Sequence, residues 1–125
     1  MTRLSTVVLV ALVLGGCKAD GPPSVDEQVR AAATAFIADC ARDDLAAAAD
    51  ILSEPVREPF IAAGDAGCAA ILGAEPRSVR VGAVEDLRSG QFATVAIEGG
   101  RSIEIERRGE LWYITTPPRS PGARR

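Results

Sequence analysis

The side chains best suited to covalent chemistry in this chain are its three cysteines, Cys17, Cys40 and Cys68. A deprotonated thiol can act as a nucleophile, bind a metal ion or exchange into a disulfide. Histidine is absent from all 125 residues, so the commonest general base and the commonest metal ligand are both missing. Any catalytic mechanism must therefore work without imidazole.

Two adjacent acidic residues, Asp43 and Asp44, are the candidates for a metal-binding pair. They stand just before an apolar stretch with helical spacing, where an acidic side chain usually accepts a hydrogen bond from the first helical turn. We therefore expect Asp43 and Asp44 to cap a helix, and we predict no metal site and no cofactor.

Cys17 follows a segment with the layout of a secretory signal peptide. Arg3 precedes an apolar run over residues 7–14, and two glycines supply the small residues at its exit. The run is shorter than the roughly 20 apolar residues that a membrane span needs. Residues 14–17 (Leu-Gly-Gly-Cys) resemble the lipobox of bacterial lipoproteins. The resemblance implies that Cys17 carries a diacylglyceryl group, that residues 1–16 are removed, and that the lipid anchors the protein in the cell membrane.

With Cys17 assigned to lipid, Cys40 and Cys68 remain as a pair in an oxidising compartment. We expect them to form a disulfide. Closing a loop of about 29 residues would stabilise the fold by roughly 3.5 kcal/mol in the chain-entropy model. The alternative is two separately buried free thiols.

The length and charge of the chain limit its function classes. After a signal peptide, what is left of the 125 residues suffices for one domain, by the usual range of roughly 100 to 200 residues per domain. The 14 basic and 17 acidic side chains give a net charge of -3. A mildly acidic chain lacks the positive charge typical of nucleic-acid-binding proteins, so we predict no nucleic-acid partner.

The first part of the domain is predicted to be helical. Residues 17–24 hold the lipidated cysteine and a polar stretch with two prolines, which predicts a flexible tether of at most roughly 25 Å. Ser24 and Glu27 match a capping box, so a long helix is expected to begin at residue 25, with Phe36 and Cys40 on its buried face. Shorter helices are expected after it: one capped by Asp43 and Asp44 and running through Leu52, one over 56–63, and one over 66–72 capped by Asp65 and ended by Gly73.

After Pro76 the spacing of apolar residues changes from helical to alternating, which predicts strands. Short glycine-containing turns separate them, so neighbouring strands should be antiparallel. Ile103 and Ile105 alternate with Glu104 and Glu106, which is typical of a sheet with one buried and one solvated face. The predicted strands are 78–84, 91–98, 101–107 and 110–116, and residues 117–125 are expected to form a disordered basic tail.

This order of elements predicts an α+β fold, in which one long and two or three short helices pack on a curled four-stranded antiparallel sheet. It resembles the NTF2-like (cystatin-like cone) superfamily, in particular its small secreted lipoprotein members. The resemblance covers most of residues 25–116 and rests on segments 36–52, 67–69 and 109–114. It implies that the first helix lies in the concave side of the sheet. The superfamily includes enzymes, transport factors and modules without known chemistry, so the fold alone assigns no function.

Enzymes of this superfamily place an acid, often with a tyrosine, inside the cone. The resemblance makes Asp39, beside the core face of the first helix, a candidate base and Tyr113, on the last strand, a candidate hydrogen-bond donor. Phe36, Phe92 and Trp112 are candidates for lining the same pocket. Alternatively, Asp39 is a solvated edge residue, Tyr113 is an amphipathic sheet residue, and the other aromatic side chains simply pack in the core.

The chemistry left to the chain favours binding over catalysis. Histidine is absent, the cysteines are assigned to lipid and disulfide, and Asp39 has no evident partner that would tune its pKa. We expect a non-catalytic binding or interaction module, held by lipid on Cys17 at the outer face of the cytoplasmic membrane. Its partner would be an unidentified protein or a small apolar ligand. The alternative is a small cyclase- or isomerase-like enzyme that uses an acid in the cone.

Overall fold

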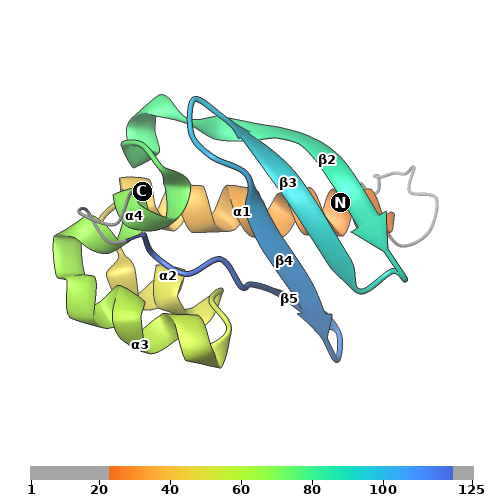
Figure 1. Ribbon diagram of the computed structural model, residues 1–125, viewed down its shortest axis with the longest axis horizontal. Helices are drawn as coiled ribbons and strands as arrows, with labels where there is room; N and C mark the ends of the chain where they lie inside the picture. Colours follow the sequence, from red (N-terminus) through yellow and green to blue (C-terminus); the bar gives the residue numbers. More distant parts are fainter. Residues whose placement is uncertain (1–22, 120–125) are drawn as a thin grey trace, which may run out of the picture.

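The structure is a computed structural model that describes residues 23–119. The predicted signal peptide, Cys17 and most of the tether lie outside the described residues, as do residues 120–125. The described chain has the expected α+β fold, with helices first and an open four-stranded antiparallel sheet after them (Figure 1). No helix between residues 23 and 119 is both long and apolar enough to cross a membrane.

The helical elements precede the strands along the chain, as predicted. The helices are α1 (Val25–Ala41), α2 (Leu45–Asp50), α3 (Glu54–Ala63) and α4 (Gly67–Leu72), with short 3-10 helices η2 (Gly64–Ala66) and η3 (Pro76–Ser78). The strands are β2 (Arg80–Arg88), β3 (Phe92–Glu98), β4 (Ile103–Arg108) and β5 (Leu111–Ile114). They lie in the order β2-β3-β4-β5, which is an antiparallel meander.

Helix α1 begins with the predicted capping box. The Ser24 hydroxyl accepts a hydrogen bond from the backbone N–H of Glu27, and the Glu27 carboxylate accepts one from the backbone N–H of Ser24, both at 3.1 Å. Both otherwise unpaired donors at the helix start are thereby satisfied. The buried face carries Phe36 and Cys40, as the helical spacing predicted.

Helix α2 is capped by Asp44 alone. The Asp44 carboxylate accepts a hydrogen bond from the backbone N–H of Ala47 at 3.2 Å, whereas Asp43 has a left-handed backbone with φ of 60°. The helix ends at Asp50, earlier than predicted, because the next residues pair with the free edge of β5. The backbone N–H of Ile114 donates to Ile51 at 2.8 Å, and that of Ser53 donates to Ile114 at 2.9 Å.

Helices α3 and α4 depart from the prediction at their starts. Helix α3 begins at Glu54 rather than residue 56, and Pro55 fits in its first turn because an N–H there has no helical partner. Asp65 does not cap α4: it lies in η2, which runs directly into α4, and no side chain caps that helix. Gly73 ends α4 with a left-handed φ of 79°, as expected.

Strands β2 and β3 both extend as far as the hairpin turn that joins them. The turn spans residues 89–91, in which Ser89 and Gly90 both have positive φ, 58° and 66°, and the backbone N–H of Gln91 donates to the carbonyl of Arg88 at 3.0 Å. The register pairs Arg88 with Phe92, so β2 extends four residues beyond the predicted end at residue 84. At the other edge of the sheet, β5 ends at Ile114 rather than at residue 116.

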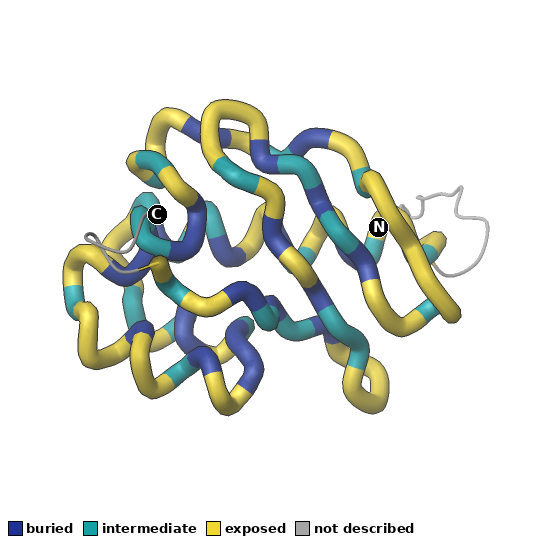
Figure 2. The backbone as a smooth tube through the Cα atoms, in the orientation of Figure 1, coloured by how far each residue is buried: buried dark blue, intermediate teal, exposed yellow. Residues whose placement is uncertain are grey.

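The core lies between α1 and one face of the sheet, and α1 passes behind the strands in Figure 1. Burial alternates along the strands, so dark and light segments follow one another in Figure 2. The sheet contributes to this core the side chains of Ala93, Val95, Ile97, Ile103, Ile105, Trp112 and Ile114. Large side chains fill the space between helix and sheet: Phe36 and Ile103 are both 0% exposed.

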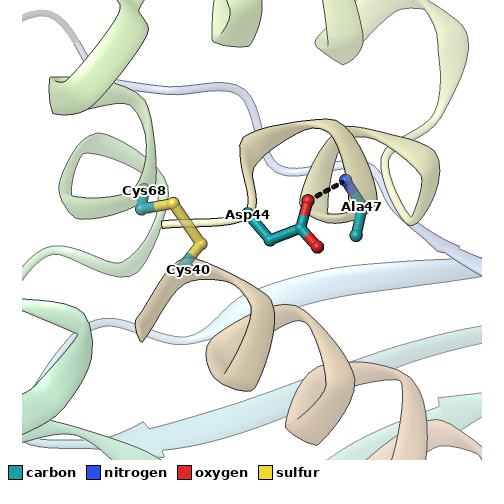
Figure 3. The surroundings of a disulfide bond; sticks show 4 residues. All are labelled: Cys40, Asp44, Ala47 and Cys68. Carbon is teal, nitrogen blue, oxygen red and sulfur yellow. Dashed lines mark hydrogen bonds between the residues drawn. A yellow bond between two sulfur atoms is a disulfide. The ribbon is translucent and has the colours of Figure 1, made fainter. Parts of the chain in front are cut away.

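The predicted disulfide joins Cys40 at the end of α1 to Cys68 in α4 (Figure 3). The two Cα atoms are 5.9 Å apart, and both residues are buried. The bond fixes α4, a helix of only six residues, against the longest helix of the domain.

Hydrogen bonds to the domain extend beyond its predicted end at residue 116. The backbone N–H of Arg119 donates to the carbonyl of Ala70 at 3.0 Å, and the carbonyl of Pro117 accepts from Arg101 at 2.8 Å. Residues 117–119, which the prediction assigns to the tail, thus make hydrogen bonds to α4 and to Arg101. We call these three residues the C-terminal segment.

Candidate functional site

The aromatic residues Phe36 and Trp112 belong to the packed core. Phe36 is 0% exposed, and its ring centroid lies 6.0 Å from that of Phe60 in α3. Trp112 is buried, and its Nε1–H donates to the side-chain oxygen of Gln28 in α1 at 3.1 Å. Phe36 and Trp112 therefore show the ordinary core packing that is the alternative to lining a pocket.

Asp39 and Tyr113 do not form a common site. Successive side chains of a strand point to opposite faces, and Trp112 and Ile114 point into the core beneath α1, so Tyr113 projects from the outer face of the sheet. Asp39, in α1 on the inner side, accepts a hydrogen bond from Arg42 at 2.6 Å. The sheet therefore separates the predicted base from the predicted donor.

Phe92 also lies on the outer face of the sheet. Its ring is 39% exposed, and the Arg88 guanidinium carbon lies 5.6 Å from the ring centroid. The strand register places Phe92 opposite Glu106, and Glu106 opposite Tyr113. These side chains form a row across the exposed face of the sheet, and Phe92 is not part of the buried core.

A cavity of about 1020 Å³ lies elsewhere, where α3, η2 and α4 meet the C-terminal segment. We call it the α3–α4 groove. Its charged lining residues are Glu75, Arg101 and Arg119, and its apolar lining residues are Pro59, Ala62, Ala63, Ala66, Ala69, Ala70, Gly73, Ala74 and Pro118. Small-molecule sites in proteins typically measure about 300 to 1,000 Å³, so the groove is large enough for such a ligand.

The sequence builds this groove by combining small side chains with one close helix contact. Alanines at six lining positions reach only one carbon beyond the backbone, so the surrounding elements do not close the space between them. Next to the lining residue Ala66, Gly67 lets α4 approach α3. A β-carbon at Gly67 would lie 2.9 Å from both the carbonyl oxygen and the ring of Phe60. The contact between α3 and α4 is therefore tight at Gly67.

Arg101 holds the groove together from the β3–β4 turn. Its Nε–H donates to the carbonyl of Ile71 at 2.9 Å, and its backbone N–H donates to the carbonyl of Leu72 at 2.8 Å. These carbonyls belong to the last turn of α4, whose carbonyl groups lack helical partners and whose dipole favours a cation. A second side-chain bond, from Nη2–H to the carbonyl of Pro117 at 2.8 Å, fixes the C-terminal segment.

The groove rim is positively charged. Burial, and after it the nearby Arg119 guanidinium, lower the pKa of Arg101 from its ordinary value. Glu75 is the acidic lining residue, and it is exposed. Among residues 23–119, no ion pair includes Glu75, Arg101 or Arg119. The two arginines therefore outweigh the single carboxylate at this rim.

Residues that could hold a metal ion do not gather in the described part of the chain. From residue 23 to residue 119, no group of three or more Cys, Asp or Glu side chains has an arrangement suited to a metal. Asp43 and Asp44 have different structural roles: Asp43 has a left-handed backbone in a turn, and Asp44 caps a helix.

The sequence contains a signal for the groove, but predicting a helix and a disordered tail over the same residues does not reveal it. Alanines and glycines dominate residues 62–74, and Arg101 follows two glycines in a turn. The partners of Arg101 lie 30 and 16 positions away in the chain, so no local pattern connects them. Arg119 falls within the residues predicted to form a disordered tail.

The sequence matches no family model, and comparisons with curated proteins and with solved structures likewise find no match.

Proposed function

We propose that this protein is a membrane-anchored lipoprotein whose folded domain is a non-catalytic binding module, and that the module binds an apolar ligand in the α3–α4 groove. The observation that carries the proposal is the groove itself, about 1020 Å³ of concave space lined mainly by hydrocarbon. The interior of the cone, where the NTF2-like resemblance would place a ligand, is filled by buried side chains such as Phe36 and Ile103.

The anchor is supported by the lipobox-like residues 14–17 and by the use of the other two cysteines. Cys40 and Cys68 are bonded to each other, so Cys17 is the thiol left for lipid attachment. Helix α1 begins at Val25, which leaves a tether of at most roughly 25 Å between lipid and domain. A long helix packed on an antiparallel meander also agrees with the proposed NTF2-like assignment.

Apolar binding follows from the chemistry of the lining. Transfer of a methylene group from water into an apolar site contributes about 0.8 kcal/mol when it is fully buried. The alanine and proline side chains of the groove have no hydrogen-bonding groups to compensate a buried polar ligand atom. A ligand therefore keeps its hydrocarbon part along the alanines and its polar part at the charged rim.

The alternative of a cyclase- or isomerase-like enzyme draws no support from the residues predicted for it. Such an enzyme needs an acid and a donor that reach one substrate atom. Asp39 is on the inner side of the sheet and Tyr113 is on its outer face.

Photo-crosslinking of the full chain in washed membranes tests the proposal. The probe is an uncharged long-chain alcohol carrying a photoreactive diazirine in its chain. Trypsin digestion after reduction releases one fragment, residues 58–77, that contains most of the groove lining. We expect labelling of this fragment in the wild type and a several-fold decrease in Ala62→Trp, whose new side chain occupies the groove.

Ala35→Trp is the matched control, because Ala35 is also an exposed helical alanine but lies in α1 and does not line the groove. Equal labelling of the fragment in Ala62→Trp and Ala35→Trp would contradict binding in the groove. So would the absence of label in the wild type.

A further inference from the structure

The rim of the α3–α4 groove carries more positive than negative charge beside its hydrocarbon lining. Arg101 and Arg119 line it together with one acid, Glu75. Within residues 23–119, none of these three side chains takes part in an ion pair. A ligand that fits both the lining and the rim has an apolar chain and an anionic end.

The Arg101 guanidinium is fixed in a position from which it can still donate. Its bonds to the carbonyls of Ile71 and Pro117 occupy two of its five N–H donors. No described residue engages the other three. Because the surrounding protein already holds the side chain, a ligand that binds it does not have to order a flexible arginine.

The positive charge of Arg119 favours binding of an anion beside Arg101. Arg119 lies close enough for its charge to act on Arg101, and two like charges at a partly buried rim repel each other. An anion near both groups replaces this repulsion with attraction. A carboxylate fits such a pair, because its two oxygens match the planar donor geometry of a guanidinium.

We infer that the ligand of the groove is a free fatty acid, whose hydrocarbon chain lies along the alanine lining and whose carboxylate is bound by Arg101 and Arg119. The inference rests on the proposed function, because it specifies the class of ligand for the same groove.

The location of the groove favours a free molecule over a lipid of the bilayer. The tether joins the domain at the start of α1, whereas the groove adjoins α4, which is bonded through Cys68 to the other end of α1. With 17 residues and a rise of about 1.5 Å per residue, α1 separates the two by about 25 Å. The attachment point of the lipid therefore does not by itself hold the groove at the bilayer surface.

Matched photoreactive probes test the inference on the full chain in phosphatidylcholine vesicles. The probes share one diazirine-bearing alkyl chain and end in a carboxylate, a hydroxyl or a trimethylammonium group. Label in residues 58–77 is compared between the wild type and Arg119→Gln, because Arg101 also holds α4 and its replacement would disturb the fold. For each probe, we take the ratio of labelling in the wild type to labelling in the variant. This ratio cancels differences in how strongly the probes partition into the membrane.

We expect Arg119→Gln to weaken labelling by the carboxylate probe about fivefold, the effect of a partly exposed ion pair. Labelling by the hydroxyl probe should stay unchanged. The control Arg80→Gln removes the same charge from the outer edge strand, where the side chain is 82% exposed, and should change neither. Raising the salt concentration should reduce the carboxylate effect.

Three results would overturn the inference. Equal ratios for the carboxylate and hydroxyl probes would show that the rim does not select an anion, while the proposed apolar site would stand. Loss of the carboxylate effect when phosphatidylglycerol is added to the vesicles would mean that the arginines bind bilayer headgroups. No label in the fragment with any probe would refute the proposed function as well.

Discussion

Replacing both Cys40 and Cys68 with alanine removes the covalent link between the end of α1 and α4. The two residues are separated by 28 positions, and the chain-entropy model assigns roughly 3.5 kcal/mol to a cross-link that closes a loop of this length. Each cysteine is 3% exposed, so the loss of each sulfur atom also removes buried contacts worth about 1 kcal/mol. We expect the free energy of unfolding to fall by roughly 5 kcal/mol.

That loss is large for a domain of this size. Natural domains are stable by about 5 to 15 kcal/mol, so the double variant is expected to be partly unfolded near room temperature if the wild type lies at the lower end. The melting temperature should fall by roughly 20 °C or more, since about 1 kcal/mol corresponds to 4 to 8 °C in a domain of 60 to 100 residues.

Fluorescence of Trp112 provides the assay, because it is the only tryptophan of the chain and is 7% exposed. Urea titrations are compared for the oxidised wild type, the wild type with reductant, and the double alanine variant. Reduction alone should remove the cross-link contribution of roughly 3.5 kcal/mol, and the substitutions should remove the packing contribution in addition. Unchanged slopes of free energy against urea would show that the unfolded state is comparable in the three samples.

The reasoning is refuted if reduction changes the free energy of unfolding by less than about 1 kcal/mol, since the cross-link would then contribute only a small part of the stabilisation expected from chain entropy. It is also refuted if both thiols of the denatured, unreduced protein react with an alkylating reagent.

Three further predictions concern other contacts. Gly67→Ala should lower the free energy of unfolding by about 1 to 3 kcal/mol in the same urea assay, because its β-carbon would meet Phe60 at 2.9 Å; a neutral effect would contradict the tight contact between α3 and α4. Trp112→Phe removes the donor to Gln28 and should cost about 1 to 3 kcal/mol, measured by circular dichroism, and the loss should shrink in a Gln28→Leu background. Cys17→Ala should abolish lipid attachment and block cleavage after residue 16, as mass spectrometry of the membrane fraction would reveal; normal cleavage after residue 16 in the variant would contradict the lipid anchor.

Local signals in the sequence predict most of the elements. The capping box at Ser24 marks the start of α1 because its two hydrogen bonds involve residues only three positions apart. The alternation over Ile103 to Ile105 marks β4 because one face of the sheet is buried. The disulfide follows from counting thiols, which requires no geometry.

The errors arise where contacts distant in sequence override local patterns. Helix α2 ends early because the backbone of residues 51–53 pairs with β5, more than 60 positions later. Phe92 lies on the outer face because it is an even number of strand positions from Thr94 and Glu98, whereas Ala93, on the alternate face, is buried. The alternation along β3 contains this signal, but the prediction gives more weight to the large apolar side chain of Phe92.

The α3–α4 groove is the feature least readable from sequence, because its wall is a helix too short to be stable alone. Isolated helices of fewer than about 12 residues are marginal in water, and α4 has six. It is held by the disulfide to α1, by the Gly67 contact with Phe60, by Arg101 at its last carbonyls, and by Arg119 at Ala70. Two of these four supports, Arg101 and Arg119, are the residues that carry the charge of the rim. Ligand affinity and the stability of α4 should therefore be coupled, and an anion that binds at the rim is expected to stabilise the domain against unfolding with the logarithm of its concentration once that concentration exceeds its Kd.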